Sequence, residues 1–262
     1  MSQRSLWGKL RLIFLIAVLI IVALNAWLSK VRTTDWQEPL WLIIYPINAD
    51  RRSDTQLFIN ALEREHFEDI EIFINREAQR YGVKLERPIE VYLAPLVDGI
   101  LPKPPKNASI LESVLWSLQM RYWAWVHDSW EGPKPDIKVY LKLFSIQNTQ
   151  VLEHSLGLQK GMIGVVNGFA SIDYQAQNGF VITHELLHTL GASDKYDLST
   201  NQPLWPHGYA APGLEPLLPQ NKAEIMGGRV PINRTESVMP DSLQDVIVGE
   251  QTAQEINWKS AQ

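Results

Sequence analysis

Two histidines stand four residues apart in the stretch Thr183–Asp197, which reads THELLHTLGASDKYD. On an α-helix this spacing brings the side chains of His184 and His188 onto one face, so that both imidazoles can bind one metal ion. Glu185 lies about 100° round the helix from His184, where a carboxylate can reach a metal-bound water without being a ligand itself. The stretch therefore predicts a helical metal site with a general base beside it.

Zinc suits this set of residues, because imidazole and carboxylate are among its usual partners in catalytic sites. Such a site has three protein ligands and leaves the fourth position to water, so one more ligand is needed. Gly191 can end the helix and turn the chain sharply, and Asp194 follows three residues later. Glu224, Asp197 and His207 are the other candidates for the third ligand, with Glu224 the first alternative to Asp194.

These residues resemble the motif of the metzincin clan of zinc metalloproteases, H-E-x-x-H-x-x-G-x-x-H, in which some branches carry aspartate at the last position. The chain also contains Ile225-Met226-Gly227-Gly228, which looks like the methionine turn beneath the metal in that clan. The resemblance implies a zinc endopeptidase with Asp194 as the third ligand and Met226 as the supporting residue of the turn. It rests on these two motifs.

The resemblance implies hydrolysis of peptide bonds by a metal-activated water. Glu185 would take the proton of this water and later pass it to the leaving amine. Several clan members carry a tyrosine two residues after the methionine, where this chain has Gly228, so the sequence leaves Tyr196 and Tyr209 as candidates for that hydrogen bond. Two other functions fit the same residues: a zinc-containing envelope module that binds a partner without cutting it, and a zinc amidase that acts on non-protein amides.

Length and composition describe a chain that can form one substantial folded domain with an appendage. It has 262 residues, of which 45% are hydrophobic and 20% are charged. The net charge of -5 argues against a general nucleic-acid binder, which would need a basic surface to neutralise phosphates. There is no cysteine, so disulfides and thiolate ligands are excluded. A peptide or protein substrate is the expected partner.

The first 35 residues are expected to anchor the protein in a membrane. Leu12–Leu28 contains Asn25 as its only strongly polar residue and is near the lower length limit for spanning the hydrocarbon core. The positive-inside bias, although weak, places the N-terminus in the cytoplasm and residues 36–262 in a periplasm or extracellular space. A cleaved signal peptide is the alternative, but Leu24 occupies the position where a cleavage site needs a small residue.

Residues 36–262 are expected to form one α/β sandwich of metzincin-like type with a mixed, twisted sheet. Apolar runs and helical periodicities alternate in an upper part, 36–191, and an irregular lower part, 192–262, follows. The strands are expected at Pro39–Ile47, Pro88–Leu96, Ile137–Phe144 and Met162–Val166, and the helices at Asp54–Tyr81, Ser109–His127, from about Asn178 through the metal motif, and at Thr252–Trp258. By analogy with the clan, Gly161–Ser171 would carry the sheet edge that holds an extended substrate.

Overall fold

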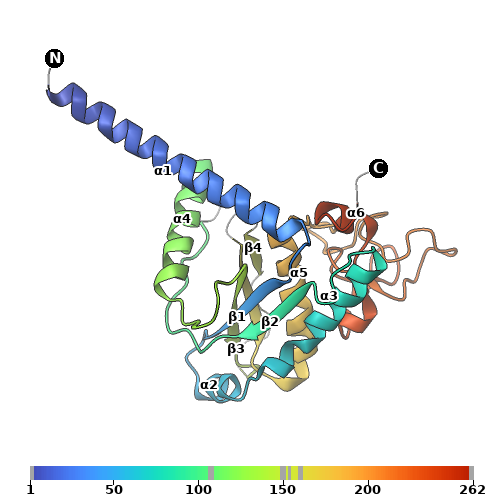
Figure 1. The fold of residues 1–262 in the computed structure, drawn as a ribbon. Coiled ribbons are helices and arrows are strands. Elements are labelled where there is room, and N and C mark those ends of the chain that lie inside the picture. The colour runs from blue at the N-terminus through green and yellow to red at the C-terminus, as the bar shows by residue number, and fades with distance from the viewer. Residues whose placement is uncertain (1–2, 106–108, 148–151, 153–154, 159–161, 260–262) are drawn as a thin grey trace.

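The computed structural model describes residues 3–105, 109–147, 152, 155–158 and 162–259. At its centre is a five-stranded sheet with the strand order β2-β1-β3-β5-β4 (Figure 1). The parallel strands are β1 Leu40–Asn48, β2 Ile89–Leu93, β3 Ile137–Phe144 and β5 Ile163–Phe169, and β4 Leu156–Leu158 runs antiparallel to β5. The expectation of an α/β fold with a mixed sheet is confirmed.

Helices cover both faces of this sheet. They are α1 Gln3–Thr34, α2 Ser53–Asn60, α3 Glu68–Arg80, α4 Ile110–Val126, α5 Gln175–Leu190 and α6 Glu250–Glu255. Figure 1 shows α3 and α5 on one face and α4 on the other. α5, which carries the two histidines, packs against β5 and β4, so the metal motif lies beside the antiparallel edge of the sheet.

The central strand β1 is buried on both faces, which explains its nearly continuous apolar sequence LWLIIYPI. Successive side chains of a strand point to opposite faces, so β1 contributes to two cores. Leu42 and Ile44 belong to the core shared with α3 and α5, while Ile43 and Tyr45 belong to the core beneath α4. The first of these cores holds α5, the helix with the metal motif, against the sheet.

The helix predicted at Asp54–Tyr81 is interrupted, and this part of the prediction is wrong. α2 ends at Asn60, and a 3-10 turn at Arg64–Phe67 precedes α3. The Glu63 side chain accepts the backbone N–H of His66, and the imidazole of His66 accepts the backbone N–H of Glu63. This reciprocal cap starts a new segment, and apolar spacing alone does not reveal it because the spacing continues across the break.

The prediction that Gly161–Ser171 provides the substrate edge of the sheet is also wrong. β5, which lies in this stretch, pairs with β3 on one side and with β4 on the other, so both of its edges already carry strand partners. β4 is the outer strand at this end of the described sheet. Gly161 itself lies outside the described residues. A three-residue strand is too short to leave a clear alternation in the sequence, so β4 was not anticipated.

α1 is one continuous helix that extends away from the sheet (Figure 1). Within the part of the chain that the structure describes, no helix combines the length and the apolar character needed to cross a membrane. The membrane span predicted at Leu12–Leu28 is therefore not supported by the structure. The side chains of residues 19, 21–23 and 25–28 of this span lie outside the described residues.

The chain after α5 is mostly irregular, as expected for the lower part. It contains two small strand pairs, β6 Ala223–Glu224 with β9 Val246–Ile247, and β7 Val230–Pro231 with β8 Ser237–Val238. The closing helix α6 begins at Glu250, two residues before the predicted start. Ile225 and Met226 belong to the same core as α3 and α5, so the lower part packs directly against the helix with the metal motif.

Candidate metal centre

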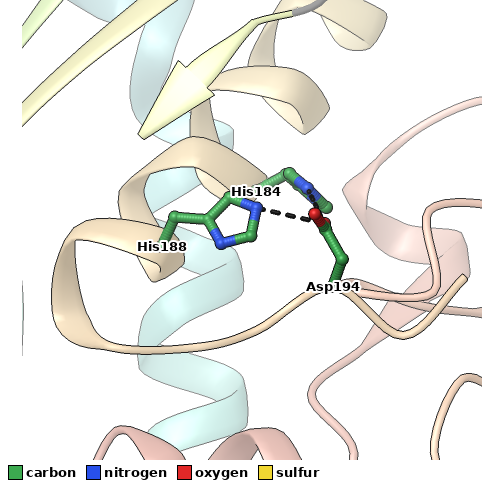
Figure 2. Close-up of side chains that lie close together, drawn as sticks. All are labelled: His184, His188 and Asp194. Carbon is green, nitrogen blue, oxygen red and sulfur yellow. Dashed lines mark hydrogen bonds and ion pairs between the residues drawn. The ribbon is translucent and has the colours of Figure 1, made fainter. Parts of the chain in front are cut away.

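His184, His188 and Asp194 converge on one point at the end of α5 (Figure 2). Asp194 Oδ1 lies 3.2 Å from His184 Nε2 and 3.1 Å from His188 Nε2. One ligand atom from each of the three residues lies within 4.8 Å of the others, and the two imidazole planes are nearly perpendicular at 86°. The spacing predicted from the sequence therefore produces a group of three side chains that could hold a metal ion.

The end of α5 sets this arrangement. Leu186, Leu187 and Leu190 are buried in the core and fix the helix, which leaves the face with the two histidines toward the lower part. Gly191 has a φ of +115°, a left-handed value that favours glycine, and it ends the helix so that the chain turns back. The turn brings Asp194 opposite the histidines, which are held by the last two turns of the helix.

Each imidazole is oriented by a backbone carbonyl at its second nitrogen. His184 Nδ1 lies 2.9 Å from the carbonyl oxygen of Ile225, and His188 Nδ1 lies 2.8 Å from that of Ala192. A carbonyl can only accept, so both Nδ1 atoms carry the proton and donate it. In the neutral imidazoles both Nε2 atoms then present lone pairs, which is the tautomer that a metal ligand needs.

The donor set fits a cation. Two Nε2 lone pairs and a carboxylate oxygen face one another at hydrogen-bond distance, an arrangement that is repulsive unless a proton or a metal ion lies among them. Burial alone would lower the pKa of His188, but its contacts with Asp194 and the Ala192 carbonyl raise that pKa above its usual value. Burial alone would raise the pKa of Asp194, but once the imidazoles also carry a proton on Nε2, their hydrogen bonds and charge hold that pKa well below its usual range. The site thus favours positive charge at its centre.

No protein-family model and no curated protein matches this sequence. The resemblance to the metzincins therefore stays a prediction from the motifs.

Glu185 lies beside the metal group in a space that two glycines leave open. A side chain at Gly157 in β4 would place its Cβ 3.1 Å from Glu185 Oε2, and one at Gly164 in β5 would place it 3.8 Å from Glu185 Cβ. Glu185 is buried, and its charge contributes to raising the pKa values of His188 and Tyr196. The carboxylate therefore lies near enough to His188 and Tyr196 to act on both electrostatically.

We expect Gly157→Ala to distort the site, because β4 crosses α5 in close contact. The new Cβ would lie 2.5 Å from His188 Cβ and 2.7 Å from the Glu185 carbonyl oxygen, and neither atom can move without shifting the helix. The strain is expected to lower the free energy of unfolding by ~1–3 kcal/mol and any hydrolytic rate by up to about 10²-fold. Thermal melting and a rate assay measure both effects.

Gly179→Ala is the matched control, since Gly179 lies on the same helix and its Cβ would meet no atom within 4 Å. This change is expected to leave the rate unchanged and to leave the stability unchanged or raise it by about 1 kcal/mol. If Gly157→Ala behaves like Gly179→Ala, the close packing of β4 on the metal-motif helix is refuted.

The methionine turn predicted at Ile225–Gly228 lies next to the metal group. Met226 is fully buried, and Gly227 packs so tightly that a Cβ would come 2.4 Å from the carbonyl oxygen of Gly208. Ile225 in the same turn provides the backbone carbonyl that orients His184. The turn is thus joined to a ligand through backbone, and Met226 contributes packing to the core beneath α5.

The alternative third ligands do not join this group. The carboxylate of Glu224 accepts hydrogen bonds from the turn and from Gly249 and Thr252 at the start of α6. Asp197 accepts hydrogen bonds from the backbone and hydroxyl groups of Ser199 and Thr200. Among the described residues, the group that could hold a metal consists of His184, His188 and Asp194, so Asp194 is the candidate that joins the two histidines. His207 is not part of it.

One positioning contact was not anticipated from the sequence. Glu255 of α6 accepts hydrogen bonds from the backbone N–H and the hydroxyl of Ser193 and pairs with the buried Lys195 at 2.8 Å. These partners flank Asp194, so α6 fixes the backbone on both sides of the third ligand. The partners are about 60 residues apart, and no local pattern links them.

Of the two tyrosine candidates, Tyr196 lies at the metal centre. Its ring centroid is 6.3 Å from that of His184. Burial, together with the charges of Asp194 and Glu185, raises the pKa of Tyr196 to about 12. The phenol therefore stays protonated near neutral pH and can donate a hydrogen bond. Tyr209 instead pairs through its backbone with Ala223.

Proposed function

We propose that this chain is a zinc-dependent endopeptidase. The observation that carries the proposal is the convergence of His184 Nε2, His188 Nε2 and Asp194 Oδ1 on one point, with Glu185 beside them on the same helix. Three ligands that include a carboxylate, with room for water at the fourth position, are the donor set of catalytic zinc. A purely structural zinc site is usually closed by four protein ligands and needs no additional carboxylate beside it.

The chemistry follows from the positions of the side chains. When bound, Zn²⁺ supplies a water of lowered pKa and polarises the scissile carbonyl. With the metal in place, Glu185 would serve as the general base that takes a proton from a water and returns it to the leaving amine, because its carboxylate is buried on the ligand helix without being one of the three ligands. The backbone carbonyls of Ile225 and Ala192 keep the imidazoles in the ligating tautomer throughout.

The substrate class is supported by the position of β4. This strand is the outer strand at the β5 end of the described sheet and passes directly over the helix at Glu185 and His188. The free edge of an antiparallel strand can hold an extended peptide by backbone hydrogen bonds. A polypeptide paired with β4 would run past Glu185, which supports a peptide substrate over the non-protein amides of the amidase alternative. Against the binding-only alternative stands Glu185 itself, since a module that only binds has no use for a general base.

Tyr196 is proposed to donate a hydrogen bond to the oxygen of the carbonyl under attack. Tyr196→Phe is therefore expected to lower kcat by about 10²-fold with little change in metal content, because one donor to the developing negative charge is lost. Steady-state kinetics together with metal analysis measure this. Tyr209→Phe serves as the control and is expected to leave kcat unchanged; equal activity of Tyr196→Phe and the parent would remove Tyr196 from the reaction.

The proposal is tested with the purified full-length chain on a mixed peptide library, with cleavage products identified by mass spectrometry. Cleavage at internal peptide bonds that stops with a chelator and returns with Zn²⁺ is expected. A chain that takes up no divalent metal, or that carries stoichiometric zinc and cuts no peptide in the library, contradicts the proposal. Attachment to a membrane and placement outside the cytoplasm stay predictions from the sequence of the first 35 residues.

A further inference from the structure

Glu224 is a fully buried acidic residue at the start of the methionine turn. Both of its carboxylate oxygens accept hydrogen bonds. Oε2 accepts the backbone N–H groups of Met226 and Gly227, each at 2.8 Å, and Oε1 accepts the N–H of Gly249 at 2.9 Å and the hydroxyl of Thr252 at 2.7 Å. Four donors meet an acceptor-only group, so the ionised carboxylate is matched to its surroundings.

The hydrogen bond to Met226 reaches the metal centre through a single peptide group. The N–H of Met226 and the carbonyl of Ile225 belong to the same planar unit and point in opposite directions. Glu224 Oε2 accepts at the N–H edge of this unit, and His184 Nδ1 lies 2.9 Å from the carbonyl oxygen at the opposite edge. Rotation of the plane that broke one of these hydrogen bonds would break the other.

We infer that Glu224 is a positioning residue for the metal centre, which holds the Ile225–Met226 peptide so that the Ile225 carbonyl orients the imidazole of His184. The inference rests on the proposed metal site and assigns Glu224 a role in place of the ligand role considered from the sequence. The carboxylate also joins the turn to Gly249 and Thr252 at the start of α6. The same helix fixes the Asp194 segment through Glu255, so the C-terminal part supports both a histidine ligand and the carboxylate ligand.

Glu224→Gln tests this role, because an amide presents one acceptor and one donor end. Whichever way it is turned, its NH₂ group faces two hydrogen-bond donors, so two of the four hydrogen bonds are lost. We expect zinc affinity, measured by competition with a chelator, to fall by about 10- to 100-fold. In the metal-free chain, the ¹⁵N NMR signals of His184 are expected to shift as its Nδ1–H loses a fixed acceptor.

Glu77→Gln is the matched control, since Glu77 is another buried carboxylate that accepts a backbone N–H, from Val248 at 2.9 Å, and it pairs with Arg76 and Arg80. It contacts none of the three ligands, so the change is expected to lower the melting temperature while zinc affinity and the His184 signals stay as in the parent. Thr252→Val, which removes only the hydroxyl donor, is expected to reduce zinc affinity in the same direction and by less.

A Glu224→Gln variant that loses stability as Glu77→Gln does, but keeps the parent zinc affinity and the parent His184 signals, would overturn the inference. If Glu224→Gln does not fold, an unchanged zinc affinity in Thr252→Val would do the same. Failure of the proposed function gives a different result from failure of this inference. A parent chain that binds no zinc contradicts the proposed function. In that case the His184 signals of the metal-free variants alone decide the role of Glu224.

Discussion

Glu185→Gln is expected to lower the rate of peptide hydrolysis by about 10² to 10⁴-fold, while the chain still binds zinc. The amide has nearly the same shape as the carboxylate, so the packing beside Gly157 and Gly164 is retained. It cannot accept a proton, however, and the general base is lost. The three ligands are unchanged: His184 and His188 keep the carbonyls of Ile225 and Ala192 at their Nδ1 atoms, and Asp194 keeps its place opposite both Nε2 atoms.

The measurement pairs single-turnover cleavage with metal analysis of the same sample. Asp173→Asn is the control, since it also exchanges a carboxylate for an amide, at an exposed position just before the start of α5. It is expected to leave both rate and metal content unchanged. Cleavage by Glu185→Gln at the parent rate would show that another group activates the water, and equal, chelator-insensitive activity in parent and variant would end the protease proposal.

Asp194→Ala removes a proposed direct ligand of the metal and is expected to weaken zinc binding strongly. The loss in affinity should exceed the ~10- to 100-fold that is typical when a group that only hydrogen-bonds to a metal ligand is removed. The variant keeps two imidazoles in the ligating tautomer but loses the only carboxylate in the group, and with it the negative charge that favours a cation there. Hydrolysis is expected to disappear with the metal. Because a ligand that binds only the folded state stabilises it, zinc at 100 times its Kd is expected to raise the unfolding free energy of the parent by about 2.7 kcal/mol, and that of the variant by much less.

Asp197→Ala is the control for this change. Asp197 is the next carboxylate along the chain, but its side chain accepts hydrogen bonds from Ser199 and Thr200 and does not join the metal group. It is expected to keep the parent zinc affinity. Zinc-dependent stabilisation that persists unchanged in Asp194→Ala would assign the third ligand to another residue, and loss of zinc in Asp197→Ala would show that the segment after α5 adopts a different arrangement.

The parts of the site that follow from local geometry could be predicted from the sequence. The four-residue step between His184 and His188 places both on one helix face whatever surrounds the helix, and Gly191 has the left-handed conformation that its position predicts. The strands β1 and β3 could also be predicted, because burial on one or both faces dictates which positions along a strand are apolar. The break between α2 and α3 was missed, since the apolar spacing does not change there.

The tertiary structure alone decided which distant groups meet. The sequence favoured Asp194 over Glu224, and the structure adds the reason: the turn after Gly191 returns Asp194 to the imidazoles, while Glu224 is fully engaged by donors from residues 226–252. The carbonyl that orients His184 is 41 residues away along the chain, and the Glu255 contact with the Asp194 segment spans 62 residues. Periodicity reports only neighbours within a helix or strand, so contacts of this range are fixed by how the lower part packs on α5, and no spacing rule contains them.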